Sequence, residues 1–231
     1  MEENESVEIK FTKQKKKAHR EKSEQNPFEA TGIAGAVYSM LHDVVCVLAV
    51  IVIAFILAVR LVGVSGISMY PTLVGEQDKL GAAGDFLVLR SNTLCASYRQ
   101  GDIVVACVPN YENGKPIVKR VIATGGQKIT FQIGSDTCMH VYVDDVLQSE
   151  DFINEPMNFS VELDGYSVTI PEGCYFLMGD NRNWSLDSRS TQIGIVDGRY
   201  IMGKALWLVF PGQDVEQGKA RNWKRLGDIY D

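Results

Sequence analysis

The chain has 231 residues, of which 45% are hydrophobic and 23% are charged. It is long enough for one or two packed domains and too ordinary in composition to be a disordered or collagen-like chain. Its formal net charge of -6 at pH 7 gives no electrostatic reason to expect nucleic acid as a partner.

The N-terminal tail, residues 1–36, holds seven lysine or arginine residues and seven glutamates, with the basic residues gathered between positions 10 and 22. We expect this tail to be largely disordered. Positive charge beside an apolar segment is retained on the cytoplasmic side of a membrane, so the tail is predicted to be cytoplasmic. The basic cluster could instead be a tag that binds nucleic acid. The interspersed glutamates and the apolar segment that follows favour a cluster that sets the membrane topology and contacts anionic lipid.

Residues 37–62 are predicted to form a single transmembrane anchor helix. Their centre, residues 44–59, is an unbroken apolar run between Asp43 and Arg60. Sixteen residues cover only ~24 Å as a helix, less than the ~30 Å hydrocarbon core. The helix is therefore extended at both ends, with Arg60 snorkelling outward. The core helix of a soluble domain would have a polar face with helical periodicity, which this segment lacks. A cleaved signal peptide would lie nearer the N-terminus, whereas 36 residues precede this segment.

The rest of the chain, residues 63–231, is predicted to be an extracytoplasmic domain that is mainly β. Short β-branched or aromatic runs alternate with glycine, asparagine and proline, which favours antiparallel sheets in a sandwich or barrel-like fold. Residues from about 130 to 172 are expected to form a smaller β insertion. The expected strands are residues 86–89, 102–108, 117–123, 128–133, 140–146, 160–170, 174–178 and 205–210.

Five cysteines are present, of which Cys46 lies in the predicted span. The other four, in the exported part, allow three disulfide pairings and match no metal-binding spacing, so their state is left open. They are Cys95, Cys107, Cys138 and Cys174.

Three polar segments carry the chemistry. Residues 66–73 (Gly-Ile-Ser-Met-Tyr-Pro-Thr-Leu) place Ser68 shortly after the apolar segment, where a serine is ordinarily a turn residue. Lys119 interrupts an apolar strand-like run, and a buried ammonium is costly unless it is paired or neutral. The alternative is a lysine on the wet face of a strand. Residues 178–189 crowd polar groups after another apolar strand, where a surface loop is the alternative.

In this order after an anchor, the three segments resemble those of the bacterial type I signal peptidases, membrane-bound serine proteases with a Ser-Lys dyad. The resemblance runs from the anchor to about residue 211. It implies that Ser68 is the nucleophile, Lys119 the general base and Ser185 the group that orients the lysine amine. It also implies five residues that brace the site: Arg120, Asp180, Arg182, Asp187 and Arg189.

Some positions depart from the family pattern. Gly66 stands where some members carry a serine that assists the oxyanion hole, so the Ser68 backbone N–H is expected to act with a second donor, either Ser65 or a water. Asn183 and Trp184 replace the usual Asp and Asn. The family also has a Gly-x-Pro-Gly-Asp stretch. In this chain its Gly, Pro and Asp are replaced by Ala123, Gly125 and Gln127.

The dyad also has a physical basis in the sequence. A serine hydroxyl needs a neighbouring base, and a lysine amine serves only when its pKa falls from ~10.4 toward neutrality. In a strand, Lys119 shares a face with Ile117 and Val121, whose apolar side chains disfavour the charged form. A Ser-His-Asp triad would need His140, because the other two histidines lie before or within the span.

The resemblance implies endoproteolysis at the outer face of the cell membrane. Signal peptides of exported preproteins would be the substrates, with small residues at the cut position and two before it, and membrane lipid would be a partner. No metal or organic cofactor is implied. The alternatives are a scaffold that keeps the fold without activity, and a different Ser-Lys membrane protease that processes itself or a regulator.

Overall fold

The computed structural model describes residues 32–76, 82–92, 97–109, 111–214, 218 and 220–230. The basic cluster at residues 10–22 and Cys95 lie outside these residues. The chain divides into two units, Met1–Ala54 and Phe55–Asp231, which are described separately below.

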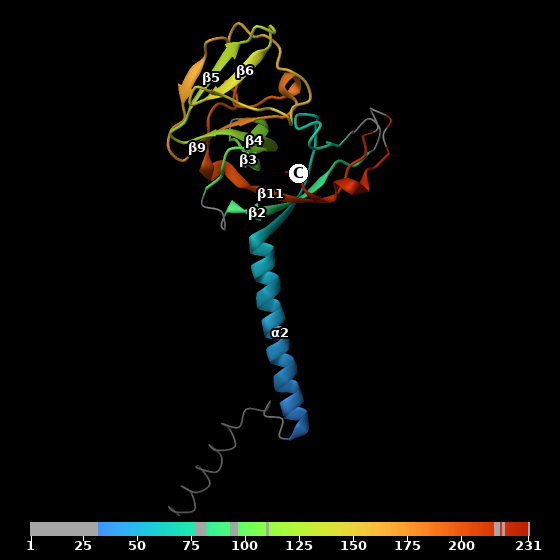
Figure 1. The fold of residues 1–231 in the computed structure, drawn as a ribbon. Helices are drawn as coiled ribbons and strands as arrows, with labels where there is room; N and C mark the ends of the chain where they lie inside the picture. The colour runs from blue at the N-terminus through green and yellow to red at the C-terminus, as the bar shows by residue number, and fades with distance from the viewer. Residues whose placement is uncertain are drawn as a thin grey trace, which may run out of the picture. The chain divides into compact units, whose positions relative to one another are not determined.

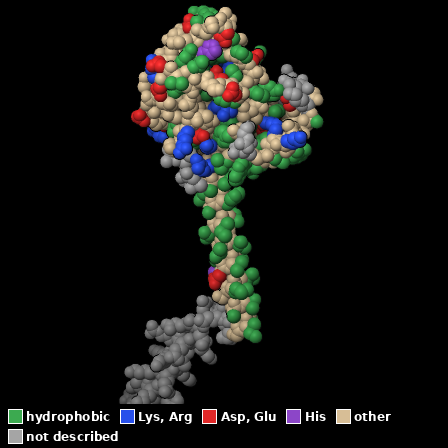
Figure 2. Space-filling model, viewed as in Figure 1, with side chains coloured by type: hydrophobic (Ala, Val, Ile, Leu, Met, Phe, Trp, Pro, Cys, Tyr) green, Lys and Arg blue, Asp and Glu red, His purple; other side chains and the backbone are tan. Residues whose placement is uncertain are grey.

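Helix α2 (Ile33–Ala58) contains 26 residues, none of them buried, and apolar side chains cover its surface (Figure 2). At 1.5 Å per residue it is about 39 Å long, which exceeds the roughly 30 Å hydrocarbon core. It is long and apolar enough to cross a membrane. The expected apolar helix is therefore present.

The predicted end of this helix at residue 62 is wrong. The helix stops at Ala58, and residues Val59–Gly63 form strand β1, which pairs antiparallel with β2 (Phe86–Ser91). Val59 and Val62 are half-buried against the sheet. The sequence pattern could not reveal this switch, because a short apolar run fits either helix or strand and the partner strand lies more than 20 residues further along.

The larger sheet has the strand order β1-β2-β11-β3-β4-β9-β10, with β12 paired to β11, and every pairing in it is antiparallel. Figure 1 shows β3, β4 and β9 side by side. The strands not yet delimited are β3 (Ile103–Cys107), β4 (Pro116–Thr124), β9 (Cys174–Met178), β10 (Val196–Asp197), β11 (Ile201–Phe210) and β12 (Gly227–Asp228).

A second, smaller antiparallel sheet has the order β7-β6-β5-β8. Its strands are β5 (Lys128–Ile133), β6 (Met139–Val143), β7 (Val146–Leu147) and β8 (Ser167–Thr169). Short 3-10 turns connect elements of both sheets: η3 (Glu112–Gly114), η4 (Arg182–Trp184), η5 (Gly198–Tyr200) and η6 (Trp223–Arg225).

Two expected strands are shorter than predicted in this sheet. The run at 140–146 is interrupted by a hairpin turn at Asp144 and Asp145, whose φ angles are 50° and 63°. Aspartate tolerates this left-handed backbone and favours such turns. Within 160–170 only Ser167–Thr169 is strand, because residues 161–165 form turns that end at Gly165, with φ of 78°.

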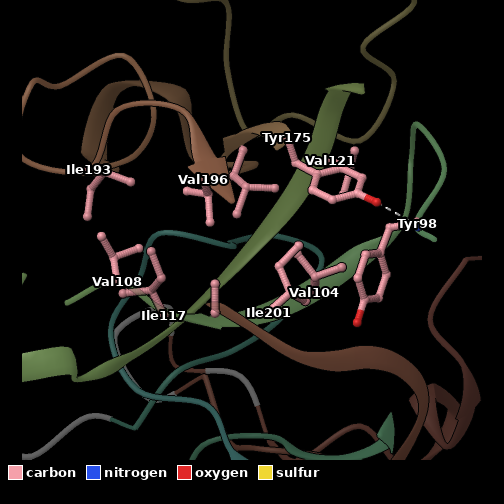
Figure 3. Packing of buried hydrophobic residues seen from close by; sticks show 11 residues of the cluster. Tyr98, Val104, Val108, Ile117, Val121, Tyr175, Ile193, Val196 and Ile201 are labelled. Carbon is pink, nitrogen blue, oxygen red and sulfur yellow. Dashed lines mark hydrogen bonds between the residues drawn. The ribbon is translucent and has the colours of Figure 1, made fainter. Parts of the chain in front are cut away.

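Strand β4 lies at the centre of the core. Its residues from Ile117 to Ala123 are all buried, so both of its faces are covered. Ile117 and Val121 belong to an apolar cluster with Val104, Tyr175 and Ile201 (Figure 3). Lys119 stands between these two apolar residues in the strand, and its environment is a packed interior rather than a wet sheet face.

The expected fold class is confirmed: the chain is mainly β and built from antiparallel sheets, and its described residues include one N-terminal apolar helix that is able to span a membrane. The four described cysteines are all free thiols: Cys46, Cys107, Cys138 and Cys174.

Candidate active site

Ser68 and Lys119 are in direct contact. Lys119 Nζ donates a hydrogen bond of 2.6 Å to Ser68 Oγ. Ser68 lies in a tight turn that follows β1, and the turn is anchored in the core by Met69 and Leu73, which are 1% and 0% exposed. The Leu73 N–H donates to the Met69 carbonyl at 2.9 Å. The fold thus brings together two residues that are 51 positions apart.

Lys119 is buried, with 3% of its surface exposed. Burial lowers the pKa of its amine to about 8; the carboxylates of Asp187 and Asp180 oppose this shift, while the charge of Arg189 adds to it. A substantial fraction of the amine is therefore neutral near pH 8 and can accept a proton from the serine hydroxyl in contact with it. This is the arrangement that activates a serine nucleophile.

The turn after β9 holds the backbone of the serine. The Asn181 N–H donates to the Ser68 carbonyl at 3.0 Å, and Asn181 Nδ2 donates to the Ile67 carbonyl at 3.1 Å. A side chain at Gly179 would collide with the Ser68 carbonyl oxygen and with the Ser185 hydroxyl. Only glycine permits this close approach, so Gly179 lets the Ser68 carbonyl and the Ser185 hydroxyl both pack directly against its backbone.

Asp180 and Arg120 form a buried ion pair beside the dyad. Arg120 Nε and Nη2 donate to the two carboxylate oxygens of Asp180 at 2.9 Å and 2.7 Å. Thr72 Oγ1 donates to the same carboxylate at 2.6 Å. Because Arg120 follows Lys119 and Thr72 lies in the serine turn, Asp180 links the segments that carry both members of the dyad.

Asp187 collects a second group of contacts. It accepts from the Ser185 hydroxyl at 2.7 Å, from Arg189 Nε and Nη2 at 2.8 Å each, and from the Gly179 N–H at 3.0 Å. Burial alone would raise the pKa of this carboxyl, but the hydrogen bonds and charge of Arg189, with the bonds from Gly179 and Ser185, lower it below its usual value. Asp187 is therefore ionised and faces Lys119 with a fixed negative charge.

The fifth bracing residue of the sequence analysis, Arg182, is 2% exposed. Its Nε donates to the Gly179 carbonyl at 3.1 Å, and its Nη1 pairs with Glu150. All the site residues named from the sequence thus fall in one connected cluster around Ser68 and Lys119.

Other residues in this cluster were missed by the sequence analysis. Asp85 is 0% exposed; it accepts from Arg225 at 3.0 Å and 2.7 Å and from the Val74 N–H at 2.8 Å. Arg225 also donates to the Thr72 carbonyl at 2.8 Å. This pair supports the serine turn from the far end of the chain. Isolated charged residues 140 positions apart give no sequence signal of such a pairing.

A cleft of about 450 Å³ opens at the dyad. Ser65 and Gly66 lie in its lining with Ser68 and Lys119. Gly66 has a φ of 76°, a left-handed conformation that favours glycine. The other lining residues are Val62, Gly63, Ile67, Glu76, Tyr111, Lys115, Pro116, Ile117, Val118, Trp184 and Leu186.

His140 lies on β6 in the smaller sheet, where its Nε2 bonds to Asp136 at 3.0 Å and 3.1 Å. Among the described residues no hydrogen bond joins it to Ser68. The amine in contact with Ser68 is that of Lys119, and this contact weighs against the triad alternative.

The chain is similar to known proteins over most of its length. The family model described as "Signal peptidase, peptidase S26" matches residues 37–210. Signal peptidase I of Bacillus licheniformis is 32% identical over 178 residues, covering 74% of this chain and 86% of that protein. A probable signal peptidase I-1 of Synechocystis is 34% identical, covering 70% of this chain and 72% of that protein. Signal peptidase I T of Bacillus subtilis is 32% identical over 68% of this chain and 76% of that protein. The chain belongs to the signal peptidase family, peptidase S26.

Proposed function

We propose that this signal peptidase cuts preproteins with Ser68 as the nucleophile and Lys119 as the general base. The observation that carries the proposal is the 2.6 Å contact between Ser68 Oγ and the amine of Lys119, which is buried and has a lowered pKa. Both groups line the same cleft, where a peptide has access to them.

The reaction proceeds through an ester. Ser68 Oγ attacks the scissile carbonyl carbon while its proton passes to the neutral Lys119 amine. The C–N bond then breaks, the new N-terminal amine leaves with that proton, and the signal peptide stays esterified to Ser68. A water, deprotonated by the regenerated amine, attacks the ester and restores the serine. The negative oxygen of each tetrahedral intermediate is stabilised by the Ser68 N–H and by a second donor, either Ser65 or a bound water.

A fluorogenic signal-peptide substrate, incubated with the purified full chain and with Ser68→Ala, tests this function. The parent is expected to cleave the peptide and the variant to be inactive. A parent that binds without cleaving would favour the inactive scaffold. A parent that cleaves only itself or another membrane protein would favour the other Ser-Lys protease, and an active Ser68→Ala enzyme would remove Ser68 from the mechanism.

The rate should depend on pH through Lys119. The base works only when neutral, and burial holds its pKa at about 8. Activity is therefore expected to fall about tenfold per pH unit below this value and to level off above it. A profile of kcat from pH 6 to 10 measures the midpoint. A midpoint near the 10.5 of an ordinary lysine would contradict a buried catalytic amine.

Ser185 is proposed to orient the lysine amine. Its hydroxyl donates to Asp187 and lies against Gly179, next to the Ser68 carbonyl. Ser185→Ala is expected to lower kcat roughly a hundredfold, or about 2 to 3 kcal/mol, with little change in KM. Ser190→Ala, which removes a hydroxyl that bonds to the Gln192 N–H, is the matched control. A Ser185→Ala rate within threefold of the parent would make this hydroxyl structural at most.

The substrate is proposed to lie extended in the cleft, between the residues that follow β1 and the start of β4. Side chains of an extended peptide alternate, so the residue before the cut and the one two earlier face the enzyme together. Shallow apolar pockets would select small residues at both positions. Comparing kcat/KM for alanine, leucine and phenylalanine at each position measures this. Equal cleavage of leucine and alanine before the cut would refute it.

The catalytic unit is proposed to lie outside the cytoplasm, with the tail inside and lipid as a partner. Strand β11 and the turn η6 expose aromatic side chains, which favour a membrane interface. Trp207 of β11 and Trp223 of η6 are 55% and 54% exposed, and the ring of Phe210 packs edge-on against that of Trp223 with 5.5 Å between their centroids. A protease added to spheroplasts should digest residues 63–231 and spare a tag at residue 1. The reverse pattern would invert the orientation.

A further inference from the structure

The connection between β7 and β8 contacts the arginines of the active-site cluster. We call residues 149–158 of this connection the latch segment. Its Phe152 ring lies 4.1 Å from Arg120 Cζ and 5.7 Å from Arg182 Cζ, and Glu150 pairs with Arg182. Its backbone also reaches the turn after β9, because the Asn154 N–H donates to the Asp180 carbonyl at 3.2 Å.

The ion pair between Glu150 and Arg182 is largely buried. The Arg182 side chain is fully buried, and only 13% of the Glu150 side chain is exposed. A guanidinium in such a position is costly unless a carboxylate compensates its charge. Glu150 supplies that charge, while Arg182 Nη2 has no hydrogen-bond partner in the part of the chain that the structure describes. Arg182 thus depends on the latch segment for its neutralisation.

The ring of Phe152 lies close to both guanidinium groups. Arg120 and Arg182 bring two positive guanidinium groups to the same ring, and like charges close together repel. The face of an aromatic ring carries negative charge density and attracts a guanidinium. Phe152 therefore attracts both guanidinium groups and offsets part of their repulsion. Leucine would fill similar space but would not provide this attraction.

Both arginines in turn hold the groups around the dyad. Arg120 fixes the Asp180 carboxylate, and Arg182 Nε fixes the Gly179 carbonyl. Gly179 and Asp180 come directly before Asn181, whose N–H holds the Ser68 carbonyl. A shift of either guanidinium would move this turn and with it the serine relative to Lys119. Displacements of about 1 Å cost large factors in rate.

We infer that the latch segment positions the catalytic turn, and that Phe152 and Glu150 are positioning residues for peptide cleavage. The inference rests on the proposed function, since it assigns these residues an effect on the reaction at Ser68. It adds residues outside the three motifs of the resemblance, and it makes the smaller sheet, through its β7–β8 connection, part of the catalytic apparatus.

The test compares Phe152→Leu, Phe152→Tyr and Glu150→Gln in the full chain. Phe152 is half-buried and borders a cavity of about 750 Å³, so its ring is not enclosed on every side. We expect Phe152→Leu and Glu150→Gln to lower kcat roughly tenfold with KM unchanged, and Phe152→Tyr to keep the parent rate. Phe159→Leu is the matched control: its ring is 50% exposed, and it should leave kcat unchanged.

Thermal melting of each variant separates positioning from stability. If Phe152→Leu is not folded at the assay temperature, a protein with 3,5-difluorophenylalanine at position 152 takes its place in the test. This residue keeps the shape of the ring and weakens the negative charge density on its face, so it should also lower kcat. Parent kcat in the leucine or difluorophenylalanine protein would overturn the inference. So would equal losses in the leucine and tyrosine variants, which would indicate packing alone. Failure of the proposed function is distinct, because the parent itself would then be inactive or Ser68→Ala active.

Discussion

Replacing Lys119 by arginine or methionine is expected to lower kcat roughly 10⁴-fold while the protein remains folded. Methionine has a similar length and suits the buried site, but it has no group that accepts a proton. Arginine keeps the positive charge and stays protonated at every relevant pH, so it cannot act as a base either. The measurement is kcat on the fluorogenic signal peptide, with circular dichroism to confirm folding.

Lys128→Met is the control for this pair of variants. Lys128 is also a strand lysine, but 46% of its side chain is exposed and it pairs with Asp145 at the surface. Its replacement should leave kcat close to that of the parent. Near-normal turnover in Lys119→Arg would exclude Lys119 as the base, and a dead His140→Ala enzyme beside it would favour a histidine triad.

Asp180→Ala is expected to reduce the free energy of unfolding by about 3 to 5 kcal/mol. The Asp180 side chain is 0% exposed and that of Arg120 is 8% exposed, so removal of the carboxylate leaves a buried guanidinium without its counter-charge. Thr72 Oγ1 loses its acceptor as well. Denaturant unfolding of the full chain in detergent measures the change.

Asp197→Ala is the matched control for this ion pair. Asp197 also forms an ion pair with an arginine, Arg199, but the Arg199 side chain is 83% exposed. Solvent-exposed ion pairs contribute little to stability. The control should unfold at almost the parent denaturant concentration. A loss of less than about 1 kcal/mol in Asp180→Ala would show that the buried pair is not a brace.

The parts of the fold that the sequence predicted are those with a local signal. The apolar run of α2 needs no partner to be recognised, and β4 is rich in β-branched residues on both sides of Lys119 and Arg120. The last residues predicted as helix became β1 because β2, far along the chain, satisfies their backbone groups. Likewise β10 and β12 have two residues each, too few for any periodicity to appear.

The site follows the same rule. Ser68, Lys119 and the acidic and basic residues after β9 were identified because a family pattern marks them. Glu150, Phe152, Asp85 and Arg225 lie in segments without such a pattern, and their roles depend on partners brought close only by the fold. Asn181 is a third kind of case, since it lies inside a recognised motif but acts through its backbone N–H on the Ser68 carbonyl, which no side-chain pattern reports.

Ser68 is proposed to form an ester with the substrate, and mass spectrometry of the quenched reaction detects this ester. The full chain is mixed with excess signal peptide, stopped in acid within milliseconds and digested, and the peptide that contains Ser68 is weighed. We expect an added mass equal to that of the residues before the cut, located on Ser68 in the parent and absent in Lys119→Met. Cleavage with no adduct at any stopping time, or an adduct on a different residue, would contradict it.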